Sequence, residues 1–140
     1  MDQPADGFDA QTGSVHDPEA IHLLESTPIG RLGFMADDGP IVLPVNFRWV
    51  DNAAVFRTLE GHMLASAADG RDVCFEVDEW DPQEKSGWSV IVRGTANEVT
   101  NWAEREQLEG IGLVPWAKEH WRPVWVRVDA TDISLRKVNK

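Results

Sequence analysis

The stretch GRLGFMADDGPIVLPVNFRWV, residues 30–50, decides the fold class. Apolar residues recur at every second position in residues 32–36 and again in residues 41–49, on either side of the Asp-Asp-Gly-Pro sequence at 37–40. Alternation of this kind predicts two strands that each bury one face, and the turn residues between them predict a β-hairpin. Pro44 cannot donate a ladder hydrogen bond, so we expect the second strand to be irregular, or at a sheet edge, there.

The same period of two continues along the rest of the chain. Further strands are expected over residues 53–58, 73–78, 88–99 and 124–133, the last with 133–138 as an extension. Short helices are expected over 18–26, 61–68 and 101–108, with Asp17 and Asn101 as N-caps of the first and third. Six strands interrupted by two or three short helices predict a mostly-β protein, a six-stranded antiparallel split β-barrel. A β-sandwich is the alternative.

Length and composition set the limits of the domain. A chain of 140 residues has room for one domain with one core. Residues 1–15 are polar and acidic, so we expect a disordered leader there and a single domain over 16–140. Cys74 is the only cysteine, which excludes an intrachain disulfide. With no apolar run long enough to cross a bilayer and no signal peptide pattern, the expected location is the cytoplasm.

Charge and motifs exclude several kinds of function. A formal net charge of −11 argues against nucleic acid or an anionic membrane as a partner, because phosphates would be repelled. The sequence has no nucleophile motif, no dinucleotide-binding glycine pattern, no P-loop and no tyrosine. The histidines lack metal-binding spacing, and only Glu76 and Asp78 of the acidic run 76–79 share a strand face, so no metal is expected. If the protein is an enzyme, a cofactor should carry the chemistry.

Two short segments have the residues to contact a ligand. Phe56-Arg57-Thr58 ends a strand just before a helix near Gly61, and so collects a guanidinium, a hydroxyl and helix N-terminal amides. This is an anion site in principle, and the alternative is a solvated arginine beside an ordinary turn. Gly87-Trp88-Ser89 places an aromatic ring beside a small residue, where it can flank a planar group. The alternative there is a tryptophan of the core or the barrel rim.

Taken in order, these segments carry a resemblance that covers roughly residues 17–138. They are Gly30-Arg31-Leu32-Gly33-Phe34, Pro44-Val45-Asn46, Phe56-Arg57-Thr58 with Gly61, Phe75-Glu76-Val77-Asp78, Gly87-Trp88-Ser89-Val90 with Gly94, and Trp125–Val128 with Ile133-Ser134. The set resembles the actinobacterial branch of the pyridoxamine 5'-phosphate oxidase-like family of FMN-binding split barrels. The resemblance implies a homodimer that binds FMN at its interface and acts as a flavin-dependent oxidoreductase on an unidentified small molecule.

The resemblance also implies which residues contact the flavin. Pro44-Val45-Asn46 would lie along the isoalloxazine through backbone groups, Arg57 and Thr58 would hold the phosphate, and Trp88 would lie near the ring or the ribityl chain. The partner subunit would supply the other wall, through the loop that carries Trp116 and Trp121. The implied cofactor-binding residues are Pro44, Val45, Asn46, Arg57, Thr58, His62, Met63 and Trp88, and no catalytic side chain is implied.

The sequence departs from the family pattern in two places. After Gly61 the family usually has one or two basic residues, whereas this chain has His62-Met63-Leu64. After Ile-Ser relatives often have Gly-Arg-Arg, whereas this chain has Leu135-Arg136-Lys137. Basic residues for a second phosphate are scarce, so oxidation of pyridoxamine 5'-phosphate itself is not expected. A second hypothesis is therefore a non-catalytic or differently loaded relative, which binds a deazaflavin coenzyme, FAD, haem or no cofactor.

Overall fold

Seven antiparallel strands and three short helices make up the described part of the protein. The computed structural model describes residues 8–13, 15–111 and 123–138. The strands are β1 (Phe8–Gly13), β2 (Ile29–Ala36), β3 (Gly39–Val50), β4 (Ala53–Leu59), β5 (Asp69–Asp81), β6 (Ser86–Glu98) and β7 (Pro123–Val138). The helices are α1 (Pro18–Ser26), α2 (Met63–Ser66) and α3 (Trp102–Glu109). None of the helices in these described ranges is long and apolar enough to cross a membrane.

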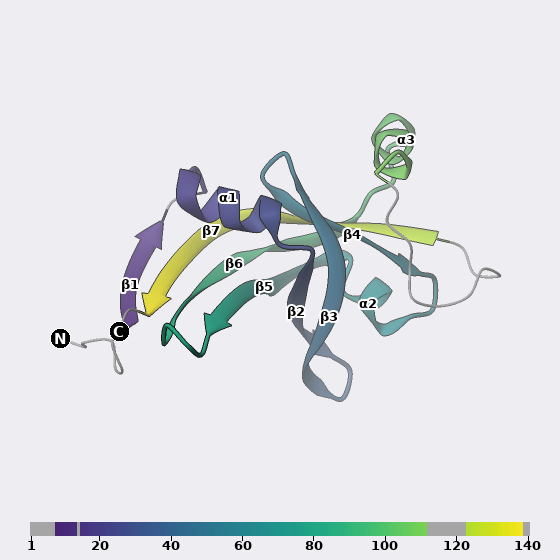
Figure 1. Cartoon of the computed structure of the whole chain (residues 1–140). Helices are drawn as coiled ribbons and strands as arrows, with labels where there is room; N and C mark the ends of the chain where they lie inside the picture. Colours follow the sequence, from purple (N-terminus) through teal and green to yellow (C-terminus); the bar gives the residue numbers. More distant parts are fainter. Residues whose placement is uncertain (1–7, 14, 112–122, 139–140) are drawn as a thin grey trace.

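Six of the strands close into a ring. Their order across the sheet is β1-β7-β4-β3-β2-β5-β6, and β6 also pairs with β7 (Figure 1). Two contacts in the ring are short: β2 meets β5 only over Arg31–Gly33, and β3 meets β4 only over Phe47–Val50. The predicted six-stranded antiparallel split barrel is confirmed, and the pairing of β6 with β7 argues against the sandwich.

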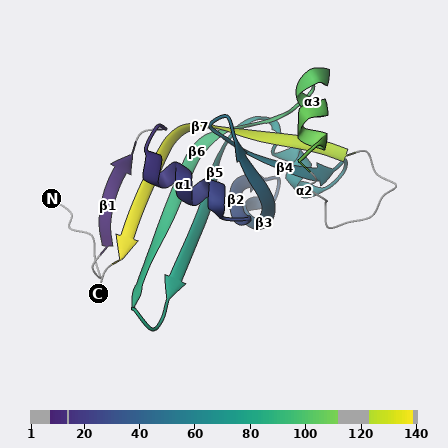
Figure 2. The same cartoon turned by 45° about the horizontal axis from the view of Figure 1, so that its top comes forward.

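The seventh strand, β1, comes from the stretch expected to be a disordered leader. Phe8–Gly13 pairs with Ile133–Val138 of β7, as Figures 1 and 2 show. The expectation of disorder is therefore wrong for these residues. The physical reason is an open edge: β4 pairs with β7 only as far as Asp129, so the backbone groups beyond it are available to another strand. Residues 1–7 and 14 lie outside the described residues.

The interior of the ring is filled by the inward rows of the strands. Phe47 and Phe75 meet edge to face, with ring centroids 4.6 Å apart. Helix α1 covers one end of the barrel and packs against β3, β6 and β7 (Figure 2). The buried residues of this cluster are Ala20, Leu24, Leu32, Phe34, Val45, Phe47, Ala54, Phe56, Leu64, Ala67, Val73, Phe75, Val77, Val90, Val92, Ala96, Val124, Val126, Val128, Ile133 and Leu135.

A second, smaller cluster lies outside the ring, where α3 packs against β4 and β7. It buries Trp125, whose indole Nε1 donates to Glu109 Oε1 at 2.9 Å. The predicted caps of α1 and α3 are confirmed: Asp17 Oδ1 accepts from the amide of Glu19 at 3.0 Å, and Asn101 Oδ1 accepts from the amide of Glu104 at 2.9 Å.

The second predicted helix is shorter than residues 61–68. Gly61 has a φ of +84°, which lies outside the helical region, and β5 already begins at Asp69. Only the four residues of α2 are left for the helix. β5 itself begins four residues earlier than the predicted strand 73–78 and ends three residues later.

Candidate functional site

The predicted binding residues of β3 and β4 lie where these two strands separate. Their ladder ends at the pair Phe47 and Phe56, so Asn46 and Arg57 are the first residues beyond it. Asn46 pairs instead with Ile29 of β2, and the amide of Phe47 donates to the carbonyl of Pro28 at 3.1 Å. Because β4 leaves β3 here, no strand of the described chain pairs with the free edge of β3 over residues 44–46.

Pro44 lies at this free edge. It pairs with Arg31 of β2 on one side, while the ladder with β4 begins only at Phe47. The missing amide of a proline costs nothing on an edge with no partner strand. The expectation that Pro44 marks an edge is confirmed.

Arg57 and Thr58 lie side by side at the end of β4 but point to opposite faces of it. Thr58 is buried against the barrel interior, with 4% of its surface exposed. Arg57 is half-buried on the outer face, where its guanidinium carbon lies 5.9 Å from the centroid of the Trp125 ring. Consecutive strand residues alternate in this way, so one phosphate can reach both side chains only beyond the strand end.

Trp88 does not lie with these residues. It pairs with Lys137 of β7, whereas Arg57 pairs with Trp125 of the same strand. Positions 125 and 137 are separated by roughly 40 Å of extended strand. Within one chain, Trp88 and Arg57 therefore stand toward opposite ends of the barrel. The loop residues Trp116 and Trp121, expected to form a wall of the site, lie outside the described residues.

Comparison of the sequence with known proteins identifies the family of the chain. The sequence profile of the pyridoxamine 5'-phosphate oxidase family matches residues 16–137, nearly all of the barrel. The chain belongs to this family. An uncharacterised protein of Mycobacterium tuberculosis is 35% identical to it over 103 residues, which are 70% of this chain and 67% of that protein.

Solved structures of similar proteins carry the same fold. The FAD binding protein from Mycobacterium smegmatis is 37% identical to this member of the pyridoxamine 5'-phosphate oxidase family. It matches with a TM-score of 0.74 over 86% of this chain and 95% of that one. An FAD-binding protein from Mesorhizobium loti has a TM-score of 0.69 over 96% of this chain and 100% of that one. At 20% identity, the second likeness concerns the fold alone.

The segment after Gly61 begins helix α2 with a histidine at the N-cap. His62 is the N-cap of α2, and its Nδ1 accepts from the amide of Leu64 at 3.0 Å. Because Nδ1 accepts this hydrogen bond, Nε2 is the ring nitrogen that is left to donate to a ligand. Met63 is 43% exposed, whereas Leu64 is buried in the core.

Glu76 is the one carboxyl group in the described ranges whose pKa is clearly shifted, and Asp78 lies beside it. Arg31 Nη1 lies 3.1 Å from Glu76 Oε1 and 3.0 Å from Asp78 Oδ2, on the outer face of β2 and β5. Burial, and then the hydrogen bond and charge of Asp78, raise the pKa of Glu76 from 4.5 to about 7, although Arg31 opposes them. No group of three or more ligating side chains in the described ranges is arranged to hold a metal ion.

This raised pKa predicts how stability depends on pH. Between pH 4.5 and about 7 the folded state keeps a proton on Glu76 that the unfolded state releases, so stability falls as pH rises through that window. Glu76→Gln cannot ionise and escapes this loss. Relative to wild type, we expect the variant to gain about 1–2 kcal/mol between pH 4.5 and pH 8, after allowance for solvent screening.

The measurement is urea unfolding of both proteins at the two pH values. Asp78→Asn is the informative second variant, because it removes one cause of the raised pKa but leaves Glu76 ionisable. It should reduce the pH dependence without abolishing it. An equal pH dependence in wild type and Glu76→Gln would show that Glu76 titrates normally.

The sequence did not predict one cluster, which joins two charged residues to Trp88. Glu79 of β5, Trp88 of β6 and Lys137 of β7 stand next to one another across three strands. The signal was available for Glu79, because the buried row of β5, residues 73, 75 and 77, continues at every second position into 79 and 81. Charged residues in an inward row mark the point where the core ends.

Proposed function

We propose that the protein is a flavin-dependent oxidoreductase that holds its flavin where β3 and β4 separate. The observation that carries the proposal is the position of Arg57, the first residue of β4 beyond the ladder, next to the free edge of β3. Family membership and the name of the FAD binding protein from M. smegmatis, 37% identical, support it. A bound flavin would supply hydride or electron transfer.

Different groups of the protein would contact different parts of the flavin. The guanidinium of Arg57, oriented by its contact with the Trp125 ring, would donate to the phosphate, and His62 would donate through Nε2. The backbone of Pro44, Val45 and Asn46 would face the isoalloxazine, because the adjacent edge of β3 has no partner strand in the described chain. Thr58 points inward, so its hydroxyl is buried against the barrel interior and does not face a phosphate on the outer side of β4.

The sequence predicts FMN, and the charge at this site bears on that choice. FMN ends in a phosphate monoester with up to two charges on one group, whereas each phosphate of the FAD diphosphate carries one. Arg57 offers one positive charge here, and Met63 stands where relatives have a basic residue. The lower charge density therefore favours FAD over FMN, in agreement with the name of the M. smegmatis relative.

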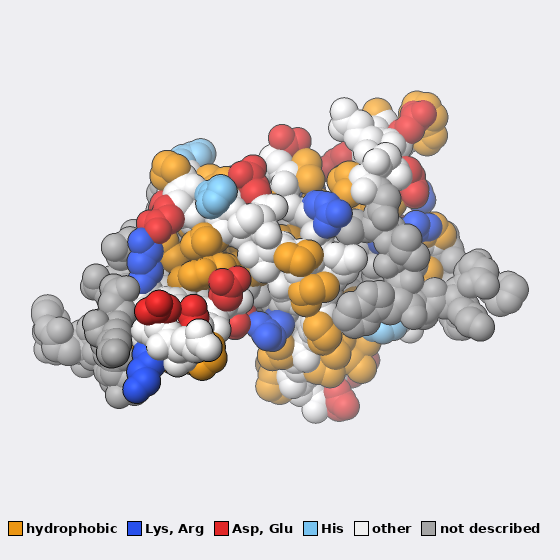
Figure 3. Space-filling view, in the orientation of Figure 1, with side chains coloured by type: hydrophobic (Ala, Val, Ile, Leu, Met, Phe, Trp, Pro, Cys, Tyr) orange, Lys and Arg blue, Asp and Glu red, His pale blue; other side chains and the backbone are white. Residues whose placement is uncertain are grey.

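A homodimer would complete the site. The outer face of the β2–β3 hairpin carries large exposed apolar side chains, with Met35 59% and Val42 63% exposed, and Figure 3 shows hydrophobic side chains gathered over this hairpin. Contiguous apolar surface of this kind is typical of an interface. Trp88 lies toward the opposite end of the barrel from Arg57, so the proposed flavin site does not include it. Cys74, exposed on β5 as a free thiol, is consistent with the cytoplasm as the location.

The proposal is tested by titrating the purified protein with FMN and with FAD. Yellow protein with about one flavin per chain is expected, with FAD bound more tightly than FMN. Arg57→Ala should weaken flavin binding about tenfold to a hundredfold, because a charge-assisted contact is lost. Arg93→Ala, which removes an exposed arginine of β6, is the control and should leave the affinity unchanged.

The outcomes separate the alternatives. Colourless protein that binds neither flavin would rule out the proposed function and leave a deazaflavin coenzyme, haem or an empty site. FMN bound as tightly as FAD would overturn only the preference for FAD. Unchanged flavin affinity in Arg57→Ala would mean that β4 does not bind the phosphate. A monomer in solution would mean that no partner subunit contributes a wall of the site.

A further inference from the structure

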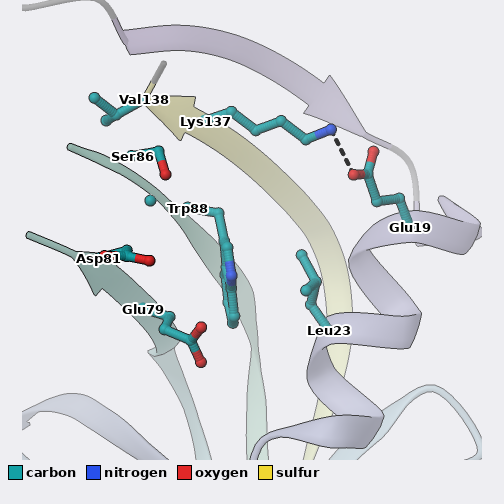
Figure 4. Close-up of a pocket in the computed structure, with 9 residues that line it drawn as sticks. Glu19, Leu23, Glu79, Asp81, Ser86, Trp88, Lys137 and Val138 are labelled. Carbon is teal, nitrogen blue, oxygen red and sulfur yellow. Dashed lines mark ion pairs between the residues drawn. The ribbon is translucent and has the colours of Figure 1, made fainter. Parts of the chain in front are cut away.

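A cavity opens at the end of the barrel that α1 covers. It has a volume of about 330 Å³, within the range of small-molecule sites, and barrel mouths are a common place for such sites. Figure 4 shows its lining from four elements: Glu19 and Leu23 of α1, Glu79 and Asp81 of β5, Trp88 of β6 and Lys137 of β7.

The cavity exists because the inward-facing rows of the strands extend beyond the packed core. On β5 the row is apolar and buried at Val73, Phe75 and Val77, and then continues as Glu79 and Asp81. Inward positions near the end of β5 are thus too polar to pack, so the space under α1 stays open. The carboxylates face it from one side.

The charge inside the cavity is negative. Lys137 Nζ lies 2.5 Å from Glu19 Oε2, so its charge is already matched. Asp81 Oδ1 accepts from the amides of Gln83 and Glu84 at 3.0 and 3.2 Å, which orients the carboxylate without neutralising it. The side chain of Glu79 makes no hydrogen bond or ion pair with any residue in the described ranges. Two carboxylates are therefore left without a counter-charge from the part of the chain that the structure describes.

Apolar surface forms the other walls. Trp88 and Leu23 both pack against the buried core on one side and line the cavity on the other. In Figure 4 the indole ring stands between Glu79 and Leu23. A tryptophan face attracts cations as well as apolar groups, and it does so most strongly when water is partly excluded.

We propose that this cavity binds an organic cation, a primary ammonium group carried on an aromatic or alkyl body. Glu79 and Asp81 receive the ammonium, while Trp88 and Leu23 pack against the body. Phosphate and anionic reduced flavin are disfavoured by the same two carboxylates. The site shares no residue with the β3–β4 strand ends. In this proposal Trp88 contacts the organic cation rather than the flavin.

Three isosteric probes test the proposal: phenethylammonium, 2-phenylethanol and phenylacetate, titrated by calorimetry into the protein as purified. We expect saturable binding of phenethylammonium at one site per chain with a millimolar or lower Kd, weaker binding of the alcohol, and none of the acid. Glu79→Gln with Asp81→Asn should weaken phenethylammonium binding about tenfold or more. The matched control, Asp38→Asn with Glu106→Gln, removes two exposed carboxylates elsewhere and should not change it.

Flavin titration of the same variants keeps this site apart from the proposed flavin site. Trp88→Leu should weaken phenethylammonium binding and leave flavin affinity unchanged. The proposal is overturned if no probe binds saturably, if phenylacetate binds as well as phenethylammonium, or if the double variant binds like the control. It is also overturned if Trp88→Leu lowers flavin affinity as much as Arg57→Ala does. The amine titration is valid even if the purified protein contains no flavin, because amine binding does not require the flavin.

Discussion

Replacing Phe75 by alanine is expected to lower the free energy of unfolding by about 4 kcal/mol, the typical cost of a phenylalanine cavity in a packed core. Phe75 lies in the middle of β5 with none of its surface exposed. Its ring meets that of Phe47 at an interplanar angle of 70°, an attractive edge-to-face arrangement. β2 and β5 pair over only three residues, so this ring packs beneath the shortest ladder of the barrel.

Chemical denaturation of wild type and variants at one protein concentration measures the loss. Met35→Ala, which truncates a side chain 59% exposed on β2, is the control and should change stability by less than about 0.5 kcal/mol. Phe75→Leu should fall between the two. A loss below about 1 kcal/mol for Phe75→Ala would mean that the barrel collapses around the gap, and would contradict a tightly packed seam.

The same ring explains the glycine at the start of the predicted hairpin. A Cβ at Gly30 would lie 2.2 Å from the tip of the Phe75 ring, so the two residues fit only as a pair. The sequence showed each of them, but not that they meet. Their contact depends on β2 lying beside β5, a pairing between segments some forty residues apart that local periodicity cannot register.

Features of the fold that depend on short segments could be predicted from the sequence, whereas features that depend on distant segments could not. The strands, the N-caps at Asp17 and Asn101 and the edge at Pro44 were predictable, because alternation, capping residues and a missing amide are properties of short segments. Strand β1 was not predictable. Phe8–Gly13 has the composition of a leader, and it is ordered by an edge of β7 that exists only once the barrel has formed.

The candidate site divides in the same way. The opposite faces of Arg57 and Thr58 follow from the period of two and were open to prediction. The distance of Trp88 from Arg57 was not, because it depends on which residues of β7 each of them pairs with. A resemblance to a family predicts which residues contact the ligand and their order along the chain. It does not say whether they meet within one chain or only across two.

Gly94→Ala is expected to cost about 3 kcal/mol, at the upper end of the usual range for overpacking, because the added methyl group meets backbone. An alanine Cβ would lie 2.2 Å from the carbonyl oxygen of Asp129, and no rotamer change can move that atom away. Gly94 lies at the β-bulge between β6 and β7, where the pairing shifts from Arg93 with Asp132 to Gly94 with Ala130. The bulge brings the two backbones together at this point.

Gly33→Ala is the matched control for this prediction. Gly33 is also a strand glycine, but its nearest neighbour to a new Cβ is a Val42 methyl carbon at 3.7 Å, an ordinary contact. We expect Gly33→Ala to be neutral or slightly stabilising, and thermal unfolding of the two variants side by side measures the difference. Equal stabilities would mean that the strands can separate at the bulge. Strand β7 would then not need this bend to pair with β4 through its first half and with β1 through its second, as it does here.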